Sequence, residues 1–419
     1  MSESTNLDLI FARVKKASRT ISSITEQRRS ELLLTLADEI TANSASLLEA
    51  NSRDLSRMER ENPLYDRLQL TPERLESIAS DMRHVASLPS PLGEVIEEHI
   101  LPNGLQLRRV RVPFGVIGVI YEARPNVTFD VFSLCFKSGN ACVLKGGSDA
   151  CHSNLAIISL IHKVLREHGI NPDVTALLPA THEATAALLN AVGYVDVCIP
   201  RGGKKLINFV RDNARVPVIE TGAGVVSTYF DAEGDVTMGT GIITNAKTRR
   251  VSVCNALDTL IIHSSRLIDL PALCSGLAEK NVELHADPRS FETLSGCYPA
   301  HLLLHADDDT YATEWMDYKM GIKTVDSIDE ALDHIATFGS GHSESIITDN
   351  QHTADRFQSE VDAACVYVNA PTSFTDGAQF GLGAEIGIST QKLGPRGPMG
   401  LREITTYRYL INGTGQLRP

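Results

Sequence analysis

Apolar residues recur at helical spacing along the first sixty residues of the chain. Between residues 6 and 60 they fall three and four positions apart, which predicts amphipathic helices. Thr71 followed by Pro72 predicts the start of a further helix. That helix should end near residue 88, because prolines follow at positions 89 and 91.

The pattern changes to alternating strands and helices between residues 114 and 231. Short apolar runs predict strands at 116–121, 141–144, 174–178, 195–199 and 216–219. Helical spacing predicts helices at 131–137, 154–168, 183–191 and 205–213. This alternation predicts an α/β domain with a mainly parallel sheet, whose ligands bind beyond the carboxyl ends of the strands.

A second α/β segment follows residue 244. Strands are predicted at 259–263, 302–304, 322–325, 345–348 and 366–368, and helices at 270–280, 327–338 and 351–360. Residues 377–400 are rich in glycine and lack periodicity, which is typical of a loop that closes over a ligand. Residues 105–112 alternate apolar and basic side chains, so they predict a half-exposed strand that could pair with a tail strand at 403–411.

Composition and charge narrow the class of protein. The chain has 419 residues and a formal net charge of −13, which argues against a nucleic-acid-binding or anionic-membrane-binding protein. No apolar run approaches the length of a membrane span, and the N-terminus lacks a signal-peptide pattern. None of the eight cysteines forms a C-x-x-C pair, and in so long a chain they predict reduced thiols and a cytoplasmic location.

The stretch from 245 to 263 combines a cysteine with three cations. Lys247, Arg249 and Arg250 precede Cys254 within seven residues, and an apolar strand follows it. Nearby cations lower the pKa of a thiol and can also hold an anionic substrate. The alternative for this stretch alone is a small buried cysteine beside a charged loop.

Two loops rich in small residues each follow a predicted strand and lead into a predicted helix. One contains Lys145, Gly146, Gly147 and Ser148, and the other contains Arg201, Gly202 and Gly203. Glycines let the backbone approach a ligand, and a helix N-terminus favours a phosphate. Ordinary strand-to-helix turns are the alternative, because neither loop matches a dinucleotide or P-loop motif.

Six blocks of sequence, in order, make the chain recognisable. They are Glu122-Ala-Arg-Pro-Asn-Val-Thr128, Leu144-Lys-Gly-Gly-Ser148, Ile199-Pro-Arg-Gly-Gly-Lys204, Asn245-Ala-Lys-Thr with Val253-Cys-Asn-Ala256, Tyr367-Val-Asn-Ala370, and Phe380-Gly-Leu-Gly-Ala-Glu385 with Gly397-Pro-Met-Gly-Leu401. Together they resemble the gamma-glutamyl phosphate reductases of the aldehyde dehydrogenase superfamily over nearly the whole chain. The resemblance implies two Rossmann-like α/β domains and a small β oligomerisation arm. It places the cofactor domain at 1–101 and 114–243, the catalytic domain at 244–400, and the arm at 102–113 and 401–419.

The resemblance also implies a reaction, the NADPH-dependent reduction of L-glutamate 5-phosphate to L-glutamate 5-semialdehyde in proline biosynthesis. The family's nucleophilic cysteine falls on Cys254, which would form a thioester and expel phosphate. The side-chain donor to the substrate oxygen falls on Asn126. Glu220 lies where oxidising relatives hold a base for hydrolysis, and that role is not carried over, because a reductase must avoid hydrolysis.

The cofactor residues follow from the same resemblance. Ser148 stands three residues after Lys145, where many NAD-using relatives have a glutamate, so the pair predicts NADPH rather than NADH. The turn Arg201, Gly202, Gly203 is placed for the pyrophosphate. Glu314 corresponds to the carboxylate on the nicotinamide ribose, with a solvated glutamate at a helix end as the alternative.

Cations near the catalytic motifs are assigned to the anionic substrate: Arg124, Lys247, Arg249 and Arg250. No metal site is predicted. The chain departs from the family pattern at Val226-Ser227, where Cys-His is usual, and at Asp258, where Glu is usual. A homo-oligomer, a dimer or higher, and a transient contact with glutamate 5-kinase are also implied.

Two other functions remain open at this point. One is an NAD(P)-dependent dehydrogenase that oxidises a semialdehyde to an acid without phosphate. The other is a silent scaffold that keeps the fold as a binding module, against which the presence of Cys254, Asn126 and both glycine loops argues.

Overall fold

The computed structural model describes residues 3–60, 62 and 65–418 and divides the chain into two compact units. The first unit runs to Thr221 and takes in Gly381–Gly387 and the chain from Met399 onward; the second comprises Gly222–Phe380 and Ile388–Pro398. The boundary therefore differs from the predicted one at 243/244. The reason is that residues 222–243 contain a strand that pairs on both sides within the second sheet and most of a helix of the second unit.

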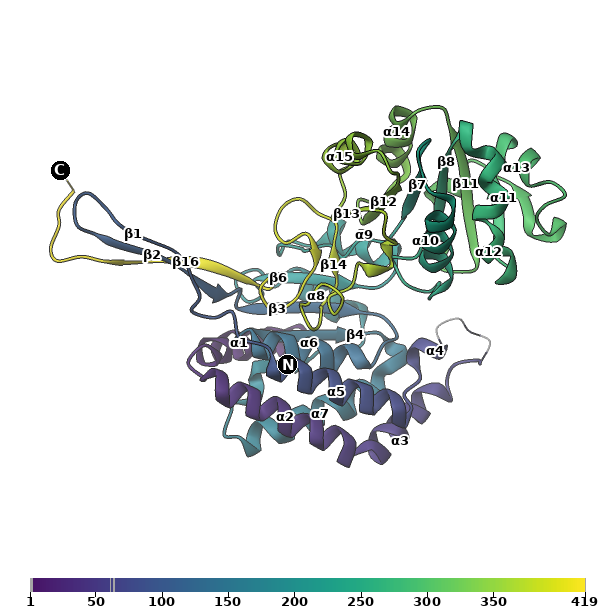
Figure 1. The fold of residues 1–419 in the computed structure, drawn as a ribbon. Coiled ribbons are helices and arrows are strands. Elements are labelled where there is room, and N and C mark those ends of the chain that lie inside the picture. The colour runs from purple at the N-terminus through teal and green to yellow at the C-terminus, as the bar shows by residue number, and fades with distance from the viewer. Residues whose placement is uncertain (1–2, 61, 63–64, 419) are drawn as a thin grey trace. The chain divides into compact units, whose positions relative to one another are not determined.

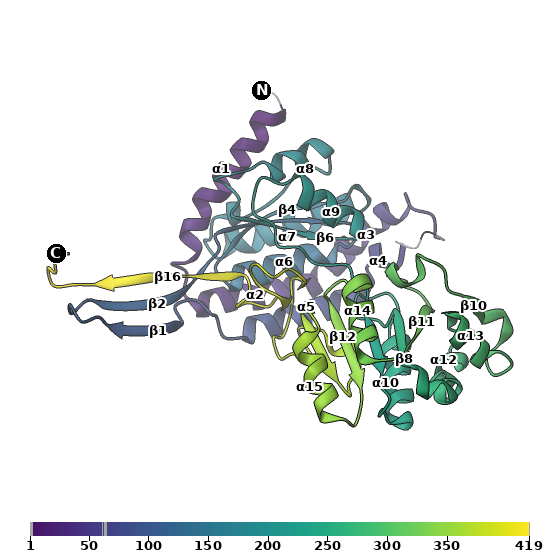
Figure 2. The same ribbon diagram turned by 90° about the horizontal axis from the view of Figure 1, so that it is seen from above.

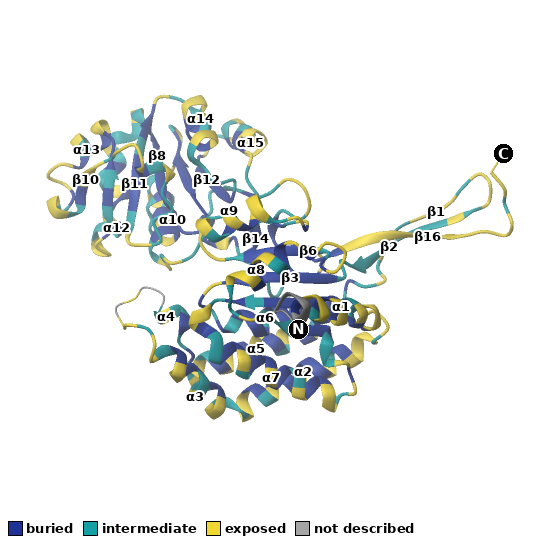
Figure 3. Cartoon of the chain, turned by 180° about the vertical axis from the view of Figure 1, so that it is seen from behind, coloured by how far each residue is buried: buried dark blue, intermediate teal, exposed yellow. Residues whose placement is uncertain are grey.

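A four-stranded parallel sheet forms the centre of the first unit. Its order is β5-β4-β3-β6, with β3 (Val116–Tyr121), β4 (Ala141–Gly146), β5 (Thr175–Leu177) and β6 (Val197–Arg201). All six residues of β3 are buried, as expected for a strand covered on both faces (Figure 3). The strand predicted at 216–219 is not formed; only an isolated bridge joins Val218 to Cys198.

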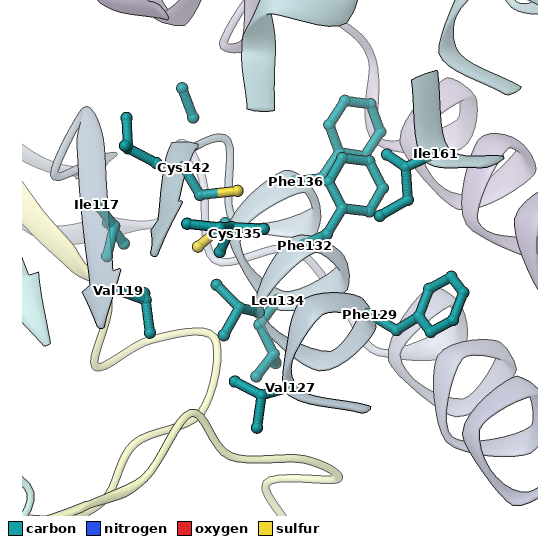
Figure 4. Close-up of a cluster of buried hydrophobic side chains, with 14 of the residues drawn as sticks. Ile117, Val119, Val127, Phe129, Phe132, Leu134, Cys135, Phe136, Cys142 and Ile161 are labelled. Carbon is teal, nitrogen blue, oxygen red and sulfur yellow. The ribbon is translucent and has the colours of Figure 1, made fainter. Parts of the chain in front are cut away.

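Helices surround this sheet (Figure 1). They are α1 (Glu3–Ile21), α2 (Glu26–Ala42), α3 (Ser44–Leu55), α4 (Tyr65–Leu68), α5 (Pro72–Ser87), α6 (Asn126–Lys137), α7 (Cys151–Glu167), α8 (His182–Leu189) and α9 (Lys204–Asn213). The predicted start at Thr71 is confirmed, because its side chain accepts the N–H of Arg74. Helix α6 is buried on almost all sides, and Phe132, Phe136 and Cys135 pack with Cys142 of β4 in the core (Figure 4).

A seven-stranded parallel sheet forms the centre of the second unit. Its order is β10-β9-β11-β8-β7-β12-β13. The strands are β7 (Ser227–Phe230), β8 (Thr259–His263), β9 (Glu283–Ala286), β10 (Leu303–His305), β11 (Lys319–Val325), β12 (Ser343–Ile347) and β13 (Cys365–Val368). The strands predicted after residue 244 are confirmed within one or two residues at most ends, whereas β7 and β9 were not predicted.

The helices of the second unit are α10 (Val236–Thr248), α11 (Leu270–Leu273), α12 (Ser275–Glu279), α13 (Pro288–Leu294), α14 (Ile328–Phe338) and α15 (Gln351–Glu360). The helix predicted at 270–280 is split in two at Cys274. Helix α10 was missed, although Asp235 caps it by accepting the N–H of Met238. The glycine-rich stretch 377–400 is loop apart from the short pair β14 (Ile388–Ser389) and β15 (Gly397–Pro398).

Three antiparallel strands form an arm on the first unit (Figure 2). They are β1 (Val95–Ile100), β2 (Gln106–Pro113) and β16 (Thr405–Asn412). The predicted pairing of the tail with the basic strand is confirmed from Thr405 against Pro113 to Asn412 against Gln106. The arm also includes β1, which was assigned to the cofactor domain. No helix in the described part of the chain is long and apolar enough to cross a membrane.

Candidate active site

The predicted cofactor residues of the first unit lie together at one edge of its sheet. Tyr121, the last residue of β3, pairs with Gly146 at the end of β4 and with Arg201 at the end of β6. The loops that follow these three strands therefore meet at the carboxyl edge. The register brings together the Lys145–Ser148 loop, the Arg201–Gly203 loop and the segment that leads to Asn126, as the alternating pattern predicted.

The segment at the end of β4 is packed against Asn154 at Gly146 and becomes exposed at Ser148. A Cβ on Gly146 would lie 2.3 Å from the side-chain amide nitrogen of the buried Asn154, so a larger residue there would displace that side chain. Ser148 is exposed and begins a short 3₁₀ turn, and Lys145 is half-buried. Burial lowers the pKa of Lys145. An ammonium and a hydroxyl three residues apart fit a phosphate monoester in their chemistry.

Carboxylates already occupy the helix N-termini after both glycine loops. Asp54 accepts the N–H groups of His152 and Ser153 at 3.1 and 2.7 Å, at the start of α7. Glu122 accepts the N–H of Gly203 at 3.1 Å, at the start of α9. At α9, a phosphate could therefore bind the helix end as expected only if Glu122 moved away. At α7, the N–H groups of His152 and Ser153 are already used by Asp54.

Asn126 begins α6 and donates its side-chain N–H to Asp130 at 2.9 Å. Burial raises the pKa of Asp130 to about 7, against the lowering by this hydrogen bond and by Arg201. Arg201, whose charge acts on Asp130, belongs to the predicted pyrophosphate loop. Its guanidinium also underlies Gly387, where a Cβ would approach it to 2.8 Å. Asp130 thus orients the amide that was predicted to hold the substrate oxygen.

Cys254 lies in the second unit, on the turn that joins α10 to β8, and is half-buried. The neighbouring side chain of Asn255 holds this turn, because it donates to the carbonyl oxygens of Ser373 and Thr375. Thr372 in return donates its hydroxyl to the Asn255 carbonyl at 2.9 Å. Cys254 is therefore placed by a buried polar framework at the amino end of β8.

Gly224 packs directly on the backbone of Cys254. A Cβ at position 224 would lie 1.7 Å from the carbonyl oxygen of Cys254 and 3.1 Å from its Cα. Asp258 also contacts the segment after Gly224. Its carboxylate accepts the backbone N–H groups of Val226 at 3.3 Å and Trp315 at 3.0 Å. These residues were not predicted as parts of the site, since their role depends on contacts between segments far apart in the sequence.

The three cations predicted beside Cys254 have different surroundings. Arg249 and Arg250 are exposed at the end of α10. Lys247 is instead fully buried, and its Nζ has no hydrogen-bond partner among the described residues. Burial lowers the pKa of Lys247 and raises that of Asp258, while the charge of each opposes the shift of the other. Lys247 therefore balances the buried carboxylate of Asp258, whereas it was predicted as one of the cations for the anionic substrate.

Two predicted site residues remain, Arg124 in the first unit and Glu314 in the second. Arg124 is half-buried in the segment before α6. Glu314 accepts the N–H of Gly224 at 3.0 Å within the second unit.

No group of three or more histidine, cysteine or acidic side chains that could hold a metal ion occurs among the described residues. Cys135, Cys142, Cys151, Cys198, Cys274 and Cys297 are free thiols.

Known proteins resemble this chain in sequence and in structure. The model of the aldehyde dehydrogenase family matches residues 1–266. The gamma-glutamyl phosphate reductase of Bacteroides thetaiotaomicron is 60% identical over 414 residues, which cover 99% of both chains. That of Pelodictyon phaeoclathratiforme is 60% identical over 406 residues, which cover 97% of both chains.

Two solved structures extend the comparison. The crystal structure of gamma-glutamyl phosphate reductase from Thermotoga maritima has a TM-score of 0.94 at 39% identity and covers 99% of this chain and 100% of that one. An acetylating aldehyde dehydrogenase from Geobacillus thermoglucosidasius has a TM-score of 0.70 at 13% identity, covering 99% of this chain and 98% of that one. The second likeness is one of fold alone, and it confirms the predicted aldehyde dehydrogenase-like architecture.

Proposed function

The chain belongs to the gamma-glutamyl phosphate reductases of the aldehyde dehydrogenase family, and from this we propose that it reduces L-glutamate 5-phosphate to L-glutamate 5-semialdehyde with NADPH, in proline biosynthesis. The observation that carries the proposal is 60% identity to a curated relative of that name over 99% of both chains. Placement of Cys254 on a turn held by Asn255 supports the proposal, since a nucleophile needs a fixed geometry.

Cys254 is the proposed nucleophile. Its thiolate attacks the acyl carbon of the substrate, the bond from carbon to the phosphate oxygen breaks, and inorganic phosphate leaves as a thioester forms. After hydride addition to the thioester carbon, the carbon–sulfur bond breaks, which releases the aldehyde and regenerates the thiolate. In both steps the carbonyl oxygen gains negative charge and needs a fixed donor.

Asn126 is the proposed side-chain donor for that oxygen. One of its two amide N–H groups is used by Asp130, which fixes the orientation of the amide, and the other would serve the substrate. Arg124, Arg249 and Arg250 are the proposed cations for the substrate's anionic groups. Lys247 is left out because its ammonium is buried beside Asp258.

NADPH supplies the hydride when it is bound. Lys145 and Ser148 are the proposed partners of its 2′-phosphate, because the half-buried ammonium and the exposed hydroxyl lie in one loop at the sheet edge. Gly146 and Gly147 let this loop pack against Asn154 and the backbone of Glu122, and Arg201, Gly202 and Gly203 are proposed for the pyrophosphate. A homo-oligomer formed through the arm and a transient contact with glutamate 5-kinase remain predictions.

The test of the proposed function is the dependence of the reverse reaction on phosphate. We expect the chain to reduce NADP⁺ with glutamate 5-semialdehyde only when inorganic phosphate is present, because phosphate must attack the thioester. Initial rates over a phosphate titration measure this. A rate that does not depend on phosphate would contradict the proposal and favour the dehydrogenase that forms an acid.

Cofactor preference is expected to follow the side chain at position 148. We expect kcat/KM for NADPH to exceed that for NADH by at least about tenfold, or about 1.4 kcal/mol. In Ser148→Glu this ratio should fall, because a carboxylate repels the 2′-phosphate. Ser159→Glu adds the same charge at an exposed position of α7 and should leave the ratio unchanged. An unchanged ratio in Ser148→Glu would remove Ser148 from the phosphate site.

A further inference from the structure

The segment that leads into β7 is held by side chains at four consecutive positions. The backbone N–H groups of Gly224, Val225, Val226 and Ser227 donate to Glu314 (3.0 Å), Ser340 (2.9 Å), Asp258 (3.3 Å) and Glu344 (2.8 Å). All four donors are buried residues. Buried N–H groups must find an acceptor, and here side chains take the place that a neighbouring strand would fill.

Three of these four acceptors are carboxylates. The three carboxyl groups accept at 2.8–3.3 Å and the hydroxyl of Ser340 at 2.9 Å, so the four hydrogen bonds are of similar length. Glu344 lies inside the second unit, and burial raises its pKa well above the usual range. Glu314 and Asp258 are the two that also connect the segment to the turn that bears the cysteine.

These contacts form a closed ring around the Cys254 turn. Glu314 holds the N–H of Gly224, whose Cα packs on the carbonyl of Cys254. The adjacent Trp315 donates its backbone N–H to the side chain of Asp258, which lies four residues after the cysteine. Asp258 returns to the first segment, because its side chain accepts the N–H of Val226 and its own N–H donates to the Val226 carbonyl at 2.9 Å.

We propose that Glu314 is a positioning residue for the nucleophile, which holds Gly224 against the backbone of Cys254 and so fixes the direction of the thiol. This inference rests on the proposed role of Cys254. Loss of the Glu314 bond frees Gly224 to move away from the Cys254 carbonyl, and a displacement of 1 Å at a reacting group can cost about a hundredfold in rate.

The proposal differs from the role that the resemblance suggested for Glu314, a contact with the ribose of the cofactor. A ribose ligand acts only when cofactor is bound and mainly sets the KM for NADPH. A positioning residue acts on the protein without cofactor and mainly sets kcat. The two roles therefore give separate results in the same variants.

The test compares Glu314→Ala and Glu314→Gln with the unaltered chain. The alanine variant should lose about tenfold to a hundredfold in kcat while the KM for NADPH stays unchanged. The glutamine variant keeps an oxygen acceptor for Gly224 and should stay within about threefold in kcat, because a neutral acceptor is weaker but present.

Alkylation of Cys254 by iodoacetamide without cofactor gives the second readout. The rate constant, followed by mass spectrometry of the Cys254 peptide from pH 6 to 9, should change in Glu314→Ala and be restored in Glu314→Gln. Asp287→Ala is the matched control, because Asp287 accepts the N–H groups of Ser290 and Thr324 in the same unit. This control should lower the Tm without changing kcat or the alkylation profile.

The outcomes separate this inference from the proposed function. Wild-type kcat and alkylation in Glu314→Ala would overturn the positioning role, and a raised KM for NADPH with unchanged kcat would assign the ribose role instead. Full activity in Cys254→Ala would overturn the role of Cys254 on which this inference rests, whereas a reverse rate that does not depend on phosphate would overturn the proposed function itself. Reduced kcat in Asp287→Ala equal to that of Glu314→Ala would show general loss of structure and would also overturn the positioning role.

Discussion

Replacing Cys254 by alanine is expected to abolish phosphate-dependent reduction of NADP⁺, with a loss in kcat of roughly 10⁴-fold or more. The thioester cannot form without the sulfur, so both the attack on the acyl phosphate and its reverse are lost. Catalysis by binding alone remains, and it is small by comparison. The half-buried side chain on a well-held turn leaves the fold little affected by removal of one sulfur atom.

The measurement is the initial rate in both directions, with the Tm as a check on folding. Cys297→Ala is the matched control, because Cys297 is an exposed thiol of the same unit and lies outside the proposed chemistry. It should keep the activity of the unaltered chain. Substantial activity in a folded Cys254→Ala variant would place the nucleophile elsewhere.

Replacing Gly224 by alanine is expected to lower kcat by about a hundredfold, through a single added methyl group. Its Cβ would lie 1.7 Å from the Cys254 carbonyl oxygen and 2.7 Å from the carbonyl carbon. No flexible side chain is available to move aside, because the opposing atoms belong to the backbone. The cysteine turn must shift, and the overpacking should also destabilise the fold by about 1–3 kcal/mol.

Gly224 does not have a positive φ, so the expected effect comes from the lack of space and not from backbone strain. Gly241→Ala provides the contrast within the same unit, since a Cβ there has nothing within 4 Å. Gly241 lies in α10, where alanine is the better helix former, so this variant should be neutral or slightly more stable. Wild-type kcat in Gly224→Ala would show that the turn tolerates displacement and would contradict the close packing.

The glycine loops and the alternating pattern of the first unit could be predicted from the sequence because both are local properties. Apolar runs between residues 116 and 199 cover β3 and most of β4 and β6, and parallel strands place their following loops at one edge. The strand predicted at 216–219 did not form, because an apolar run is also a local property and does not supply a pairing partner. Only Val218 pairs, through an isolated bridge to Cys198.

The boundary between the units and the extent of the arm needed the tertiary structure. The segment 222–243 gives a weak local pattern, and β7 becomes a strand because β8 and β12 pair with it on either side. Strand β1 is mostly exposed and lacks an apolar alternation, so its pairing with β2 could not be seen beforehand.

For the candidate site, the sequence by itself determined which residue types are present and their order: Cys254 in its motif, Asn126 after a proline, and the lysine–serine loop. Only the tertiary structure decided that Lys247 is buried beside Asp258 and that Glu314 holds Gly224 against the cysteine turn. The physical reason is that a motif is read along the chain, whereas burial and hydrogen-bond partners depend on segments separated by 90 residues, as from Gly224 to Glu314.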